Sequence, residues 1–161
     1  MLIDEESIAA AWKSLLKSER SKGQIVYVPH GAERPVRFSR EQIFRLALQI
    51  CNALHRKLEV PKFGRVALLA GADPNATAIC HGCWLGNFSL VLVDPKASIE
   101  RLIAVINNAE VDTVFFSMAH MMTMSKLIKS CAGVRHWVLT EGSGLNGHGT
   151  SLHVLANLLG D

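Results

Sequence analysis

Three stretches of the sequence carry residue types whose spacing suits chemistry. Cys80 and Cys83 form a C-x-x-C pair, which occurs in redox dithiols and in zinc sites. Residues 142–147 read GSGLNG and match the G-x-G-x-x-G pattern of dinucleotide-binding loops. His120 and His136 fall near the ends of expected elements, where open α/β sheets often bind ligands. Whether each stretch can do this chemistry depends on the helix, strand or loop in which it lies.

The cysteine pair is expected in the middle of a helix. Asp73 and Pro74 favour a helix start, because Asp caps free N–H groups and Pro suits the first helical position. A redox pair would instead sit at a helix N-terminus, where the dipole lowers the thiol pKa. A structural zinc site needs two further ligands, and the sequence has no second C-x-x-C; the haem attachment pattern fails at Trp84. We expect small buried residues on a core helix.

The glycine-rich stretch is expected to be a surface loop. A dinucleotide fingerprint needs a tight turn from a strand into a helix, followed by another strand with an acidic residue. Here residues 149–151 prolong the loop, and we expect no further strand after it. No Gly-Lys-Ser/Thr occurs, which excludes a Walker-type loop. The histidines are read as solvated loop residues, so we assign no catalytic, cofactor-binding or metal-ligating residue.

Composition favours a single folded domain. The chain has 161 residues, is 49% hydrophobic and carries a net charge of +3 with no basic cluster, so nucleic acid is not an expected partner. No apolar run is long enough for a membrane span. The acidic N-terminus lacks the pattern of a signal peptide, which favours a cytoplasmic protein whose four cysteines stay reduced.

The centre of the chain is a strand–helix–strand unit over residues 65–95. The apolar runs 66–70 and 89–93 flank a helix that ends near residue 85. About thirty residues suit a βαβ crossover between parallel strands. Because both runs are continuously apolar, we expect both strands to be buried on both faces, beneath helices.

The remaining pattern predicts one domain, 1–161, in three parts. Residues 1–38 contain an amphipathic helix (4–20) and a small hairpin (24–28 with 36–38) placed at an edge. The core, 39–140, alternates helices and strands; its first helix begins with a capping box at Ser39 and Gln42. Residues 141–161 give the loop and a last helix. The fold class is therefore α/β, with an open, mainly parallel sheet and helices on both faces. The other expected elements of the core are a helix at 98–108, a strand at 111–116, a helix at 120–129, a strand at 134–139 and, after the core, a helix at 152–159.

A series of short motifs then suggests a family. In chain order they read VRFSREQI (36–43), FGRVALL (63–69), DPN (73–75), GCWLGN (82–87) and VLVDP (91–95). Together they make the run from 36 to 138 resemble the N-terminal part of the adenylate-forming (AMP-binding) enzymes: acyl-CoA synthetases, aryl-acid ligases, peptide-synthetase adenylation domains and luciferases. The sequence departs from the family pattern at 88–90, where small residues are usual, and at Val93, where Leu is common.

The resemblance implies a ligase that activates a carboxylic acid with ATP and Mg²⁺ and transfers the acyl group to a thiol, of CoA or a carrier protein. The family's phosphate loop and catalytic lysine have no counterpart in these residues, so we expect this portion to be inactive alone and to bind neither ATP nor Mg²⁺ by itself. Its partner would be the remainder of the ligase or another protein, and self-association is plausible. The Met-rich helix would form core, an interface or one wall of an acyl pocket.

Two alternatives stay open. The first is a truncated, non-catalytic relative that acts as a binding or assembly module. The second is an unrelated nucleotide or redox domain that uses the glycine-rich loop or the cysteine pair.

Overall fold

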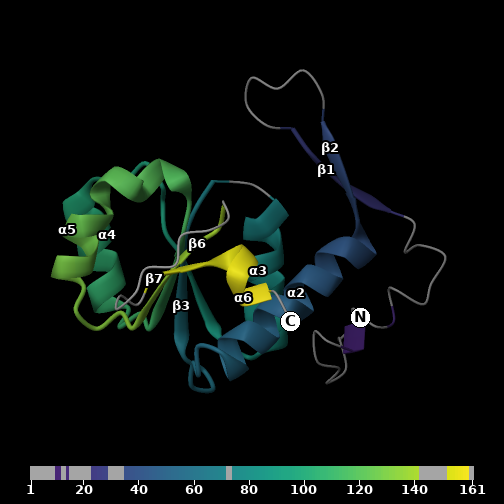
Figure 1. The fold of residues 1–161 in the computed structure, drawn as a ribbon, viewed down its shortest axis with the longest axis horizontal. Coiled ribbons are helices and arrows are strands. Elements are labelled where there is room, and N and C mark those ends of the chain that lie inside the picture. Colours follow the sequence, from purple (N-terminus) through teal and green to yellow (C-terminus); the bar gives the residue numbers. More distant parts are fainter. Residues whose placement is uncertain are drawn as a thin grey trace, which may run out of the picture.

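The protein is described by a computed structural model that covers residues 10, 11, 14, 23–28, 35–71, 74–141 and 152–159. Most of the expected helix 4–20 and the expected loop 142–149 lie outside these residues. The described part contains a five-stranded sheet, a separate two-stranded sheet and the helices that pack beside them (Figure 1).

The five-stranded sheet is wholly parallel. Its strands lie in the order β4-β3-β5-β6-β7. The chain runs from β3 to β4 on one side, then crosses back to β5 on the other side of β3, so the strand order reverses between β3 and β5. The strands are β3 (Arg65–Leu69), β4 (Ser89–Leu92), β5 (Thr113–Phe116), β6 (His136–Leu139) and β7 (Leu152–Val154).

Helices cover both faces of this sheet, as the sequence predicts (Figure 1). One face packs on α2 (Arg40–Arg56), α3 (Pro74–Leu85) and α6 (Leu155–Leu159). The other packs on α4 (Ile99–Asn108) and α5 (Met124–Ser130). Successive residues of β3 point to opposite faces: Val66 and Leu68 join the first core, and Ala67 and Leu69 join the second.

Local sequence signals set the starts of two helices. The capping box of α2 is present, because the Ser39 hydroxyl accepts from the Gln42 N–H and the Gln42 side chain accepts from the Ser39 N–H. Ser98 caps α4 by accepting from the N–H of Arg101. Helix α3 begins at Pro74 as predicted, while its expected cap, Asp73, lies outside the described residues.

Several expectations need correction. Strand β4 is at the end of the sheet, and Leu92 is 69% exposed, so the expected burial of both its faces is wrong. The expected helix 120–129 is a 3-10 helix, η2 (Met118–Thr123), followed by α5. The expected helix 152–159 begins instead with β7, because pairing with β6 selects an extended backbone over these three residues.

The predicted hairpin is confirmed as an antiparallel pair, β1 (Gln24–Tyr27) and β2 (Val36–Ser39). It forms a sheet of its own beside the start of α2 rather than extending the edge of the five-stranded sheet (Figure 1). Ile25 and Phe38 pack against the core on the α2 side, whereas Val26 and Val36 are largely exposed.

Candidate functional site

The candidate site lies at the carboxyl edge, where the C-terminal ends of the parallel strands meet. In open α/β sheets ligands bind outside this edge, at the point where the strand order reverses. Here that point falls between β3 and β5. A group of polar residues gathers at this edge, and we call it the carboxyl-edge cluster: Asn75, Ser117, His120, Thr140 and Glu141.

Burial distinguishes this cluster from an ordinary surface. Four buried polar side chains occur among the described residues, and three of them, Ser117, His120 and Thr140, belong to the cluster. Buried polar groups cost free energy unless they are hydrogen-bonded. Their concentration at the reversal point therefore needs a structural or a functional reason.

Hydrogen bonds tie the cluster's elements to one another. From the first turn of α3, Asn75 Nδ2 donates to the carbonyl of Thr140 after β6, at 2.9 Å. The backbone N–H of Met118, which begins η2, donates to Glu141 Oε2 at 3.1 Å. Thr140 Oγ1 donates to the carbonyl of Phe116 at 3.3 Å. The segments that follow β3, β5 and β6 are thus held in fixed relation.

His120 is the buried titratable group of this cluster. Burial lowers the pKa of its imidazole, so the ring is neutral at pH 7 and carries one donor and one acceptor nitrogen. Its backbone is fixed on both sides: its N–H donates to the Ser117 carbonyl at 3.0 Å, and its carbonyl accepts from Thr123 Oγ1 at 2.9 Å. A neutral imidazole can donate to and accept from a polar group without adding charge.

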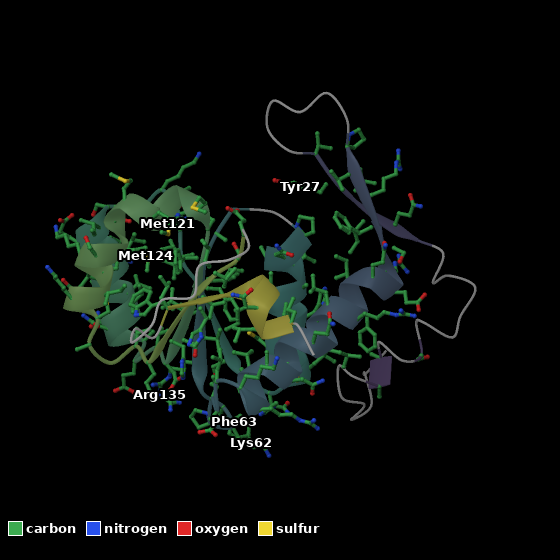
Figure 2. The ribbon with its side chains drawn as sticks, viewed as in Figure 1. Tyr27, Lys62, Phe63, Met121, Met124 and Arg135 are labelled. Atoms are coloured by element: carbon green, nitrogen blue, oxygen red, sulfur yellow. The ribbon has the colours of Figure 1, made fainter. Side chains whose placement is uncertain are left out.

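The side of the cluster along η2 is apolar. Met118 is 46% exposed and Met122 is 94% exposed. Met121, which is half-buried, and Met124, which is buried in the core, are labelled in Figure 2. The predicted Met-rich face is therefore divided between core and surface. Exposed methionines adapt to irregular apolar shapes, so this side suits a hydrophobic group.

The two histidines singled out in the sequence lie at opposite edges. His120 follows the carboxyl end of β5, whereas His136 is the first residue of β6 and lies at the amino edge. The structure therefore does not bring them into one site. At the amino edge the Nδ1 of His136 lies 3.3 Å from the Nε2 of His153, on β7.

The cysteine pair lies in the middle of α3, as expected. Burial raises the pKa values of both thiols, and that of Cys83 further still because Cys80 and Cys51 are nearby. Neither thiol is activated as a nucleophile. The glycine-rich stretch lies outside the described residues, but the expectation that no strand follows it is wrong, since β7 does.

Sequence reasoning missed Asn75, Ser117, Thr140 and Glu141 as members of a site. The available signal was positional: Ser117 follows β5 directly, and Thr140 and Glu141 follow β6 directly, so parallel pairing brings these positions together. In the described part of the chain, no group of three or more His, Cys, Asp or Glu side chains is arranged to hold a metal ion.

Comparison with known proteins adds a fold relationship. No protein-family model matches the chain, and no curated protein matches it either. Among solved structures, one match is described as a putative long-chain-fatty-acid CoA ligase from Rhodopseudomonas palustris CGA009. It matches 97% of this chain with a TM-score of 0.77 and 16% identity, and this chain covers 37% of that protein.

Two further structures give the same result. The anthranilate CoA ligase AuaEII in complex with anthranoyl-AMP matches over 92% of this chain, with a TM-score of 0.76 and 14% identity. A benzoate CoA ligase from Burkholderia xenovorans LB400 matches over 96%, with a TM-score of 0.74 and 14% identity. This chain covers 26% and 28% of those proteins. The resemblance to adenylate-forming enzymes is thus confirmed at the level of the fold. No described helix has the length and apolar character needed to cross a membrane.

Proposed function

We propose that the chain is part of an adenylate-forming ligase, which activates a carboxylic acid with ATP through an acyl-adenylate and passes the acyl group to a thiol. The observation that supports this most is the extent of the structural match. Three CoA ligases share the fold over 92–97% of this chain, and one of them was solved with anthranoyl-AMP. The sequence motifs of residues 36–95 point to the same class independently.

In this proposal the carboxyl-edge cluster forms one wall of the acyl-adenylate site. The exposed methionines of η2 contact the apolar part of the acid, and the neutral His120 and the Ser117 hydroxyl offer hydrogen bonds to its polar end. Mg²⁺ does not fit the described residues of the cluster: Glu141 is its one carboxylate, and Oε2 of that group already accepts from Met118. Phosphate and metal contacts would come from other parts of the ligase.

Exposed apolar side chains mark where those other parts would pack. Val26, Val28 and Val36 are 44–66% exposed around the hairpin, and Leu92 and Met122 are exposed at the carboxyl edge. Since this chain covers 26–37% of the matched ligases, a completed protein would have further residues to cover these positions. We place the protein in the cytoplasm, with CoA or a carrier protein as the thiol acceptor.

The proposal is tested with the protein isolated from its native cells. Its intact mass is measured first, and ATP–pyrophosphate exchange is then assayed with a panel of fatty and aromatic acids. We expect acid-dependent exchange, because formation of an acyl-adenylate is reversible. A protein that exchanges no pyrophosphate with any acid, alone or with the proteins that copurify with it, would contradict the ligase and favour a non-catalytic binding module.

A further inference from the structure

Two histidines meet on neighbouring strands at the amino edge of the sheet. His153 of β7 is in register with Val138 of β6, and His136 lies two residues before Val138, so both imidazoles project from the same face. The Nδ1 of His136 and the Nε2 of His153 are 3.3 Å apart, and the ring centroids are 5.4 Å apart. Both side chains are partly buried.

This contact depends on protonation. Between two neutral imidazoles, one nitrogen donates its proton and the other accepts it with its lone pair. One added proton still leaves a donor facing an acceptor. Two added protons put N–H against N–H and place two positive charges at a contact of 3.3 Å, which is repulsive. The pair is therefore compatible with zero or one added proton, and not with two.

The surroundings keep the pair neutral at pH 7. Burial lowers the pKa of both imidazoles, and each charged histidine would also repel nearby charge: Arg135 disfavours protonation of His136, and His136 disfavours that of His153. Asp112 and a hydrogen bond to the backbone of Leu58 act in the opposite direction on His136. Asp112 is itself paired with Arg135, at 2.7 Å, so these two charges largely offset each other.

The elements that the pair holds are short. Strand β7 has three residues and α6 has five, and they attach to the rest of the protein through the ladder to β6 and through Val154, Leu155 and Leu158 in the core. Short elements with few hydrogen bonds open locally at low free-energy cost. The contact between His136 and His153 adds a side-chain interaction to this ladder and to these core contacts.

We propose that the His136–His153 pair is an acid-sensitive latch: two neutral imidazoles hold β7 and α6 on the sheet, and double protonation releases them. Because the folded-state pKa values lie below the ordinary histidine value of about 6.5, the stabilisation is present above that pH. It is lost as the pH falls below it, through the lowered pKa values. The strands β3 and β5 at the centre of the sheet contain no titratable partner of the pair and should keep their protection.

The test is amide hydrogen exchange of the full chain at pH 7.5 and pH 5.0, corrected for the intrinsic pH dependence of exchange. We expect protection over 152–159 to fall at least about tenfold at pH 5.0 relative to that of β3 (Arg65–Leu69). In His153→Gln, which keeps a hydrogen-bonding side chain without a titratable charge, the difference between the two pH values should shrink to the part that comes from the burial of His136 alone.

Two controls make the result decisive. His55→Gln changes a histidine of α2 that stacks on Phe88, outside the pair, and should leave the pH-dependent loss intact. If His153→Gln does not fold, His136→Gln tests the same contact from the other strand. Equal protection of 152–159 at both pH values, equal loss in β3, or the same loss in the glutamine variant would each overturn the latch.

Discussion

The two edges of the five-stranded sheet are formed by the same strands and differ in chemistry. At the amino edge, Arg65 pairs with Glu110 and Arg135 pairs with Asp112, and all four side chains reach solvent. At the carboxyl edge, the described residues show one ion pair, between Lys126 of α5 and Glu100 of α4 at 3.1 Å, and three of the four buried polar side chains, Ser117, His120 and Thr140. The two edges thus differ in their share of buried polar groups, because the amino edge holds only one of these four, Thr113.

The backbone conformation also differs between the two edges. All four described non-glycine residues with positive φ, Glu59, Phe63, Asn87 and Glu110, lie in the helix-to-strand connections of the amino edge. Tight turns there fix the strand starts. Side chain–backbone hydrogen bonds between segments far apart in sequence join both edges: Asn75 to Thr140 and Met118 to Glu141 at the carboxyl edge, and Arg135 to the Glu59 carbonyl at the amino edge. The amino edge therefore contains the positive-φ turns, while the carboxyl edge is the one at which open α/β sheets bind ligands.

The largest expected effect comes from replacing the His120 imidazole at the carboxyl edge. If the protein is the proposed ligase, His120→Gln should lower its ATP–pyrophosphate exchange about 100-fold, because a neutral imidazole is lost from the proposed acyl-adenylate site. The melting temperature should change little. His55→Gln is the control and should leave exchange unchanged. Exchange at the original rate in His120→Gln would show that this edge takes no part in the reaction.

The next effect concerns the hydrogen bond that joins α3 to the end of β6. Asn75→Ala leaves the partly buried Thr140 carbonyl without its donor and should lower the free energy of unfolding by about 1–3 kcal/mol. Asn107→Ala is a matched control, because Asn107 Nδ2 donates to the exposed Ser130 carbonyl at 3.0 Å, where water can replace it. Denaturant unfolding of both variants gives the comparison; equal losses would contradict the special burial of the carboxyl edge.

At the amino edge, Asp112→Asn should lower stability without affecting the site. Its carboxylate is 16% exposed and accepts from Arg135 Nε at 2.8 Å and from Thr113 Oγ1 at 3.1 Å, so we expect a loss of about 1–2 kcal/mol. Urea unfolding measures the loss. ATP–pyrophosphate exchange per folded molecule should stay constant. A change in this activity would contradict the claim that the amino edge takes no part in the reaction. Glu41→Gln, in a solvent-exposed pair with Arg45, should lower stability by less than about 0.5 kcal/mol.

The smallest expected effect is a gain in stability. Phe63 has a φ of 63° and a side chain that is 65% exposed, so its ring contributes little burial to offset an unfavourable backbone (Figure 2). Phe63→Gly should raise the free energy of unfolding by about 0.5–1 kcal/mol. Phe63→Ala removes the same ring and keeps the strain, so it should show no gain. A gain of equal size in both variants would mean that the ring, and not the backbone, is responsible.

Much of the fold could be predicted from local signals. The capping box of α2, the apolar runs of β3 and β5 and the crossover length predicted the parallel α/β sheet correctly. Strand β7 was missed because Leu-His-Val carries no run of its own, and its extended form depends on pairing with β6. The exposure of β4 was missed because strand order decides which strand is at the end of the sheet, and composition does not report it.

The site was less predictable than the fold. The sequence drew attention to His120 and His136 as equals, yet one lies at each edge. Asn75 and Glu141 carry no motif, and their role depends on hydrogen bonds across 65 and 23 positions of sequence. Such contacts follow from the order of the strands, which no single stretch of residues encodes.

The most direct test of the central claim is a ligand footprint on the complete protein. Amide hydrogen exchange is measured with and without a stable acyl-adenylate analogue whose acid supports pyrophosphate exchange. We predict added protection over 117–120 and 140–141, at the carboxyl edge, and none over 58–64 or 109–112, at the amino edge. Protection confined to the amino edge, or absent from the carboxyl edge while the analogue is bound, would contradict it.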